Sequence, residues 1–246
     1  MKIKEMNEAL QWLRDKYAVK ADGTLTATAP DFIGAGAELK LADGTVAKLL
    51  PWRQERRFVE LKKLVDGKTL EDVSTLRFAA MSAEKSLEKL LYRELDLCAF
   101  LGESPIVSVF AVTNGKTANA IVKLADDKSC SIECSAALPA GTGEMDRHEI
   151  IARRGIACDR TVDTQVPQSS IYQFTRDGEK RYTDTDTELF GFSADEITLI
   201  RAAFEVLQHP ELAEIWNEAD AKLTEITRAA LESEKNGKPA IFAEEK

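Results

Sequence analysis

The spacing of apolar residues predicts helices near both ends of the chain. Met6, Leu10, Leu13 and Tyr17 recur every three or four positions, which predicts a helix over 4–17. The same period predicts helices over 54–65, 83–101, 193–207 and 210–236. Ser193 with Glu196 three residues later is a capping box that starts the fourth of these helices. Asn236-Gly237 marks the end of the last one.

Strict alternation of apolar and polar residues predicts strands in the middle of the chain. Over 117–125 and 128–138 every second residue is apolar, so that Cys130, Ile132 and Cys134 share one face of a strand. Further strands are predicted over 38–41, 46–49, 73–80, 106–113, 145–152, 156–162, 170–175 and 179–183. Asp43-Gly44, Asp126-Asp127, Arg154-Gly155 and Asp177-Gly178 lie between strands as hairpin turns. The segment 106–113 is apolar on both faces, which is typical of a central strand.

This order of elements predicts an α+β fold, with an open antiparallel or mixed β-sheet and helices packed on one face. The other face carries small and polar residues, and we expect it to be solvated or buried against another subunit. We expect two domains. Residues 1–52 form a small helix-plus-hairpin appendage, and residues 53–246 form the α+β domain.

The composition argues against two classes of binding partner. The net charge of -9 repels phosphate backbones and anionic membranes, so we expect neither nucleic acid nor a membrane as a partner. No apolar run approaches the roughly 20 residues that a membrane-spanning helix needs. The first five residues lack the apolar stretch of a secretion signal, and we expect a cytoplasmic protein.

The cysteines do not predict a metal site. Cys130 and Cys134 lie four residues apart on one strand, roughly 13 Å along it, which is too far for one tetrahedral ion. With Cys98 and Cys158 they are expected to be buried, reduced thiols. Only two histidines occur, so we expect no histidine-based metal centre.

Several stretches match, in order, one known family. They are Arg57 to Val65 with Leu70 to Val73, Arg93 to Leu97 with Phe100-Leu101-Gly102, Ala118 to Ala136, His148 to Ile156, and Asn236-Gly237-Lys238-Pro239. From about Arg56 to Phe242 the chain resembles the C-terminal half of Gfo/Idh/MocA-type oxidoreductases. The resemblance implies sugar or cyclitol substrates and a sheet face that forms dimers and tetramers.

The chain departs from this family where the family performs its chemistry. It has no G-x-G-x-x-G, and Gly34-Ala35-Gly36 lacks the third glycine. Only about fifty residues precede the resemblance, so we expect the nucleotide-binding Rossmann domain to be missing and no cofactor to bind. The family's Glu-Lys-Pro segment, which supplies a catalytic lysine, is absent. Arg93 stands where the family has a proton-transferring histidine, and arginine cannot serve as a base.

Four residues of one predicted helix are candidates for ligand binding. Lys89, Arg93 and Asp96 share one side of the helix at i, i+4 and i+7. They could form a remnant polar pocket for an acidic sugar or cyclitol, or a surface ion-pair ladder, which we favour. Tyr92 could stack on a sugar ring or be a core or interface aromatic residue.

His148 is a further candidate. Alternation puts Asp146 and His148 on one face of a predicted strand. This pair could be catalytic on the exposed sheet face, but we favour a histidine whose hydrogen bonds are satisfied within an interface. Arg53, Arg56 and Arg57 form a basic cluster that we expect to pair with neighbouring carboxylates or to contact another chain.

The sequence therefore predicts a protein that assembles or binds a ligand. We expect an oligomerising accessory subunit, or a carbohydrate- or cyclitol-binding subunit, without independent dehydrogenase activity. The open sheet face would form a homodimer or higher oligomer, or would bind a full-length Gfo/Idh-type dehydrogenase. The alternatives are a sugar- or cyclitol-active oxidoreductase whose NAD(P)-binding domain comes from another chain, and a cofactor-independent sugar enzyme.

Overall fold

The computed structural model describes residues 1–159, 170–176, 178–183, 188–189 and 191–242. The chain divides into two compact units. Unit 1 comprises Met1–Glu55 and Thr185–Lys222, and unit 2 comprises Arg56–Asp184 and Leu223–Lys246. The division after Glu55 lies close to the boundary expected after residue 52. Residues 185–222, which the sequence placed in the second domain, group with unit 1 because their helix contacts the N-terminal helix.

The described residues of unit 1 form helices and a small antiparallel sheet. Its elements are α1 (Ile3–Tyr17), β1 (Gly23–Ala27), β2 (Ala37–Leu41), β3 (Val46–Lys48), the 3-10 helix η1 (Pro51–Gln54) and α4 (Ala194–Gln208). The sheet has the order β1-β2-β3. The predicted hairpin at Asp43-Gly44 is confirmed, with Gly44 at φ 91°. The capping box of Ser193 and Glu196 is also confirmed at the start of α4.

Helix α5 (Leu212–Asn236) has residues in both units. It begins two residues after Pro210 and ends before Gly237, which has the left-handed conformation at φ 63°. None of the helices in the described part of the chain is both long and apolar enough to cross a membrane.

Unit 2 contains a nine-stranded sheet of order β11-β10-β9-β8-β4-β7-β6-β5-β12. The strands are β4 (Val73–Met81), β5 (Ile106–Thr113), β6 (Thr117–Leu124), β7 (Ser129–Ser135), β8 (Met145–Ala152), β9 (Gly155–Cys158), β10 (Ser170–Thr175), β11 (Gly178–Thr183) and β12 (Ala240–Ile241). β4 and β7 are parallel and the other neighbours are antiparallel. The predicted mixed sheet is therefore confirmed.

One strand was placed wrongly. The segment 106–113, expected in the centre, is β5 and has only the two-residue strand β12 outside it. Its apolar residues do not all lie in the core, since Val112 is half exposed. The central position belongs to β4, whose neighbours are β7 and β8.

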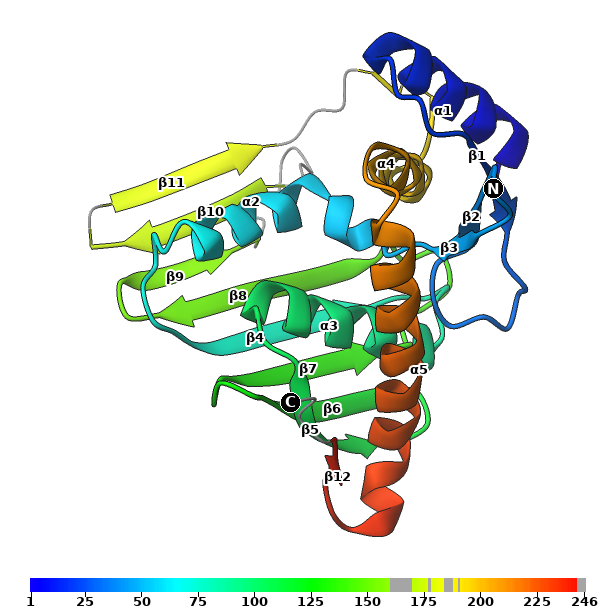
Figure 1. Cartoon of the computed structure of the whole chain (residues 1–246). Coiled ribbons are helices and arrows are strands. Elements are labelled where there is room, and N and C mark those ends of the chain that lie inside the picture. The colour runs from blue at the N-terminus through cyan, green and yellow to red at the C-terminus, as the bar shows by residue number, and fades with distance from the viewer. Residues whose placement is uncertain (160–169, 177, 184–187, 190, 243–246) are drawn as a thin grey trace. The chain divides into compact units, whose positions relative to one another are not determined.

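Helices cover one face of this sheet, as predicted (Figure 1). α3 (Leu87–Gly102) contacts β4, β6 and β7, and α2 (Arg56–Asp66) contacts β10 and β11. The alternating apolar residues of β6 and β7 lie on the face that α3 covers and are buried: Ala118, Ala120, Val122, Leu124, Cys130, Ile132 and Cys134. The α+β fold with helices on one sheet face is therefore confirmed.

Candidate functional site

Six charged side chains form a closed ring within unit 2. Helix α2 supplies Arg57, and α3 supplies Arg93 and Glu94. Strand β8 supplies Asp146 and His148, and Asp159 follows directly after β9. Positive and negative groups alternate around the ring in the order Arg93, Asp146, Arg57, Asp159, His148, Glu94.

The two arginines bind Asp146 from two helices. Arg93 Nη2 donates to Asp146 Oδ2 at 2.5 Å. Arg57 donates two hydrogen bonds to the same carboxylate, at 2.6 and 2.7 Å, and one to Asp159 Oδ2 at 3.1 Å. Because Asp146 accepts from both guanidinium groups, it joins α2 and α3 to β8.

His148 closes the other side of the ring. Its Nδ1 lies 2.6 Å from Asp159 Oδ2, and its Nε2 lies 2.8 Å from Glu94 Oε2. Both nitrogens face carboxylates, which accept hydrogen bonds, so the imidazole is held as the imidazolium with both nitrogens donating. Glu94 Oε1 lies 3.6 Å from Arg93 Nε, and this contact completes the ring.

A branch leads from the ring toward the surface. Arg93 Nη1 donates to Glu144 Oε1 at 2.8 Å, and Lys85 Nζ lies 2.6 Å from Glu144 Oε2. The Lys85 and Glu144 side chains are about one third exposed. The eight groups carry four positive and four negative charges, so the cluster is neutral when all are ionised.

The pKa shifts follow this arrangement. Burial alone lowers the pKa of His148, but the carboxylates of Asp159 and Glu94 outweigh burial and raise it to about 9. Burial alone raises the pKa of Asp146, but Arg93 and Arg57 outweigh it and hold this pKa well below 3.8. For Asp159, His148 outweighs burial and lowers the pKa. The fold therefore favours the ionised form of these three groups.

Aromatic rings enclose the cationic groups. The Phe58 and Phe78 rings meet the His148 ring edge-on, with centroids 4.6 and 4.9 Å away. The guanidinium carbon of Arg57 lies 4.5 Å from the Phe58 centroid. The face of an aromatic ring attracts cations, so Phe58 also stabilises the Arg57 guanidinium.

Three members of the ring also have the composition of a metal site. Potential ligand atoms of Asp146, His148 and Asp159 lie within 4.8 Å of one another. The Arg57 guanidinium, however, binds both carboxylates, and Nδ1 of His148 binds Asp159. Arg57 and protonated His148 already neutralise these two carboxylates. The described side chains therefore do not form a site that fits a metal ion.

The arrangement cannot perform general base catalysis with His148. An imidazolium that donates from both nitrogens has no lone pair to accept a proton. Burial also raises the pKa of the Cys130 and Cys134 thiols, which keeps them protonated and unreactive. All four cysteines are buried and reduced, as predicted.

The predicted surface ladder on α3 is wrong. Arg93 and Asp96 are 6% and 1% exposed, because the helix buries this side against the sheet. Tyr92 is fully buried, so that no ligand reaches its ring in this conformation. Lys89 is only partly exposed. A ligand-binding role for Lys89, Tyr92, Arg93, Asp96 and His148 remains a prediction.

The expected location of His148 is also wrong. The alternation is correct, but His148 is completely buried on the helix-covered face rather than on the exposed face. Its ring binds Asp159 and Glu94 in place of Asp146. The predicted pairing of Arg56 and Arg57 with carboxylates is confirmed, through Glu60 for Arg56 and through Asp146 and Asp159 for Arg57.

Two ring members were missed although the sequence carried a signal for each. Glu94 follows Leu90 and Leu91 at helical spacing, so it is a charge on the apolar side of a helix. The predicted hairpin put Asp159 beside the strand that carries His148, but with its turn at Arg154-Gly155. The turn lies one residue earlier, at Arg153-Arg154, and this register pairs Glu149 with Cys158 and brings the next residues, His148 and Asp159, together.

Comparison with known proteins finds similarity in structure alone. No protein-family model matches the chain, and no curated protein matches its sequence. Solved structures do match. A levoglucosan dehydrogenase in complex with NADH and levoglucosan is 12% identical with a TM-score of 0.63, and the match covers 80% of this chain and 66% of that one.

Two further matches are similar in extent. An oxidoreductase from Agrobacterium radiobacter, in complex with NAD+, L-tartaric acid and magnesium, is 14% identical with a TM-score of 0.61, covering 81% of this chain and 66% of that one. The myo-inositol 2-dehydrogenase from Lactobacillus plantarum is 14% identical with a TM-score of 0.57, covering 79% and 64%.

The chain spans slightly less than two thirds of the length of these solved structures. At this level of identity the likeness concerns the fold. The architecture and the comparisons agree on the fold of this chain. It is the fold of the C-terminal α+β half of Gfo/Idh/MocA-type oxidoreductases, the family that the sequence resembles.

Proposed function

We propose that this protein is an assembly subunit of the oxidoreductase fold, which associates through the open face of its large sheet and has no independent dehydrogenase activity. The observation that carries the proposal is the neutral ring. Its groups bind one another, which leaves His148 without a proton-accepting nitrogen. The polar residues of α3 are therefore suited to hold the fold together rather than to transform a substrate.

The open face of the sheet has the properties of an association surface. Six apolar side chains are exposed on it: Val112, Ile121, Met145, Ile156, Phe174 and Ile241. Ile121 is 60% exposed. A nine-stranded sheet with strands about 4.8 Å apart and about six residues long presents a face on the order of 800 Å². This is about the area that one partner buries in a stable interface.

A second copy of this chain is the occupant that suits this face. Arg77 and Arg147 lie on either side of Glu149, so the polar part of the face carries both signs of charge. A two-fold interface needs a surface that is complementary to itself, and such a mixed patch can pair with its own copy. A full-length dehydrogenase with the same fold would offer a related face and is the other partner that we consider.

Substitution of Ile121 tests the association. We expect the wild-type protein to sediment as a dimer or higher oligomer, and Ile121→Lys to weaken association at least about tenfold because a charge enters the apolar interface. The measurement is sedimentation equilibrium over a wide concentration range. Ile215→Lys, in unit 1, is the control, since Ile215 is 52% exposed and does not belong to the large sheet.

Two outcomes would contradict the proposal. One is a wild-type protein that remains monomeric at every concentration and alongside a full-length relative. The other is equal weakening by both substitutions, which would show that charge in general, rather than the sheet face, decides association.

The alternative function is oxidoreduction of a sugar or cyclitol with an NAD(P)-binding domain from another chain. The solved structures that hold NADH or NAD+ together with a sugar or a hydroxy acid favour it. In such a complex Lys89, Tyr92, Arg93, Asp96 and His148 would be the candidates for lining a substrate pocket.

Titration with nucleotides and polyols tests whether this chain by itself binds a cofactor or a substrate. We expect no saturable change in the fluorescence of Trp12, Trp52 and Trp216 when the purified protein is titrated with NAD, NADP or a panel of polyols. All three tryptophans lie in unit 1, so isothermal calorimetry is needed as a second readout for unit 2. Tight binding of a nucleotide by the protein alone would contradict the proposal. Binding of a polyol without a nucleotide would favour the carbohydrate- or cyclitol-binding subunit that the sequence also predicts.

A further inference from the structure

Three strands, β1 and β3 of the small sheet and β5 of the large one, receive hydrogen bonds from helix side chains along one edge. A strand at the edge of a sheet has backbone N–H and C=O groups that can pair with a strand of another chain. In the described residues the outer strands of the small sheet are β1 and β3, and β5 is covered only partly by β12. At each of these three edges, side chains from α1 or α5 occupy the place of a partner strand.

Asn7 of α1 binds the edge of β1. Its Nδ2 donates to the Leu25 carbonyl at 3.0 Å, and its Oδ1 accepts from the Leu25 N–H at 2.7 Å. One side-chain amide thus makes both hydrogen bonds that a residue of an antiparallel partner strand would make.

Asn217 of α5 binds the edge of β3 with the same two side-chain groups, but it bridges two residues of the strand. Its Nδ2 donates to the Val46 carbonyl at 2.8 Å, and its Oδ1 accepts from the Lys48 N–H at 2.8 Å. Asparagine carries a donor and an acceptor on one rigid group, which is the combination that a strand edge requires. The small sheet therefore carries an asparagine on each of its two outer strands.

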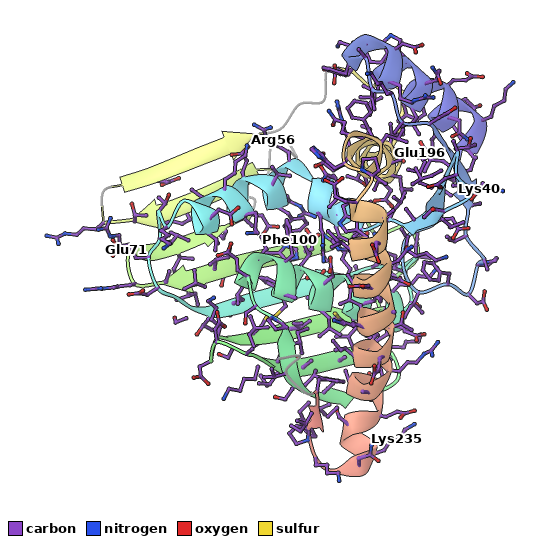
Figure 2. The ribbon with its side chains drawn as sticks, in the orientation of Figure 1. Lys40, Arg56, Glu71, Phe100, Glu196 and Lys235 are labelled. Atoms are coloured by element: carbon purple, nitrogen blue, oxygen red, sulfur yellow. The ribbon has the colours of Figure 1, made fainter. Side chains whose placement is uncertain are left out.

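The edge of β5 is covered in two stages. Near its start, Ala240 pairs with Val109 and the Phe242 N–H donates to the Val107 carbonyl at 2.9 Å. Figure 1 shows β12 beside this strand, and Figure 2 labels Lys235 at the end of α5 next to it. Every second residue of β5 directs its backbone to this edge, so Ala111 and Thr113 come next.

Side chains of α5 bind these two residues. The Ala111 N–H donates to Ser233 Oγ at 2.9 Å, and the Thr113 N–H donates to Glu234 Oε2 at 2.7 Å. Ser233 Oγ lies 2.7 Å from the Ala230 carbonyl, to which it donates its own proton. The last turn of α5 thus continues the cover from the point where β12 ends.

We propose that Asn7, Asn217 and the pair Ser233-Glu234 are edge caps, which close β1, β3 and β5 to strand addition by a second copy of this chain. The hydrogen bond from the Thr113 N–H to Glu234 is exposed, and water could accept this hydrogen bond instead. The need to satisfy a buried N–H group therefore does not explain why Glu234 binds this edge. A carboxylate on a strand edge also repels an approaching edge of the same kind. The proposal does not depend on association through the sheet face.

The experiment uses the full chain with the double substitution Ser233→Ala and Glu234→Ala. At low concentration we expect the amide hydrogens of Ala111 and Thr113 to exchange about tenfold faster than in wild type, since each loses one hydrogen bond. At raised concentration we expect new oligomers by light scattering. Within them, the Ala111 and Thr113 amides should become protected again, because a strand of a second copy now pairs with β5.

Two matched substitutions on the same helix are the controls. Thr227→Ala removes a buried hydroxyl that bonds within the helix, to the Leu223 carbonyl at 2.7 Å. Glu232→Ala removes a neighbouring exposed acid. Both should leave the exchange at Ala111 and Thr113 and the state of association as in wild type.

The proposal is overturned if the double variant keeps the wild-type state of association while both amides exchange fast. It is also overturned if oligomers form but the two amides stay unprotected within them, because association then uses another surface. If the double variant fails to fold, Glu234→Ala alone gives the same test at Thr113, where the site is exposed.

Discussion

Replacing Arg93 by methionine is expected to lower the free energy of unfolding by about 3–5 kcal/mol. Arg93 is 6% exposed, and its guanidinium lies between three carboxylates, those of Glu94, Glu144 and Asp146. Methionine fills much of the volume but brings no charge. The eight-member cluster, most of which is buried, then holds one excess negative charge, which is costly.

Urea denaturation of Arg93→Met measures this loss. Arg154→Met is the matched control, because Arg154 also forms an ion pair, with Glu71 at 2.6 Å, but its side chain is more than half exposed in the turn between β8 and β9. An exposed pair contributes about 1 kcal/mol or less, so the control should differ little from wild type. Equal effects of the two substitutions would refute the structural role of the buried ring.

A double-mutant cycle tests whether the ring acts as one unit. Asp146→Asn removes the carboxylate that binds both Arg93 and Arg57. Combined with Arg93→Met it restores neutrality, so we expect the double variant to lose about 1–3 kcal/mol less than the sum of the single variants. Strict additivity would show that the two groups do not interact.

The free energy of unfolding is expected to fall as the pH rises from about 6.5 to 9. The pKa of His148 is raised from 6.5 to about 9 in the folded protein, so folding favours the protonated ring. Its contribution is therefore complete below pH 6.5 and is lost as the pH rises through about 9. The size of this contribution is about 3 kcal/mol, with a slope of about 1.4 kcal/mol per pH unit inside the window.

The chain provides its own control for this prediction. It has only two histidines, and His209 is more than half exposed in unit 1. His148→Gln should abolish the fall in the free energy of unfolding that wild type shows between pH 6.5 and 9. His209→Gln should show the same fall as wild type. Chemical denaturation at intervals of half a pH unit would measure both. A wild-type slope that survives in His148→Gln would contradict the assignment of the imidazolium.

At acidic pH the free energy of unfolding changes with pH in the opposite direction. The pKa values of Asp146 and Asp159 are lowered from 3.8, so their stabilising contribution is complete above that pH and is lost as the pH falls through the lowered values. The ring therefore supports unit 2 most strongly between about pH 4 and 6.5, where its carboxylates are ionised and His148 is protonated.

The sequence by itself determined the elements of this protein, because their signals are local. The periods of 3.6 and 2 residues depend only on the backbone geometry of a helix and a strand, so the α3 stripe and the alternation of β6 were visible without any partner. The hairpin turns fixed which strands pair with their neighbours in the chain. Together these signals were sufficient for the fold class.

Only the tertiary structure decided how distant segments meet. β4 and β7 pair in parallel although more than forty residues separate them in the chain. This pairing puts β4, rather than β5, at the centre of the sheet. Alternation shows that Asp146 and His148 share a face but not which face the helices cover. Arg57 reaches Asp159 across 102 positions of the chain, and no local pattern encodes a contact of that length.

The members of the candidate site could not be predicted from the sequence as the helices and strands could. A charge on a helix is stable at the surface with water or in the core with partners, and its own sequence neighbours do not distinguish the two cases. For Arg93 the partners came from β8 and the segment before it, so its burial could be known only once the sheet and α3 were packed together. The chain encoded the ring, but only the folded structure brings its members into contact.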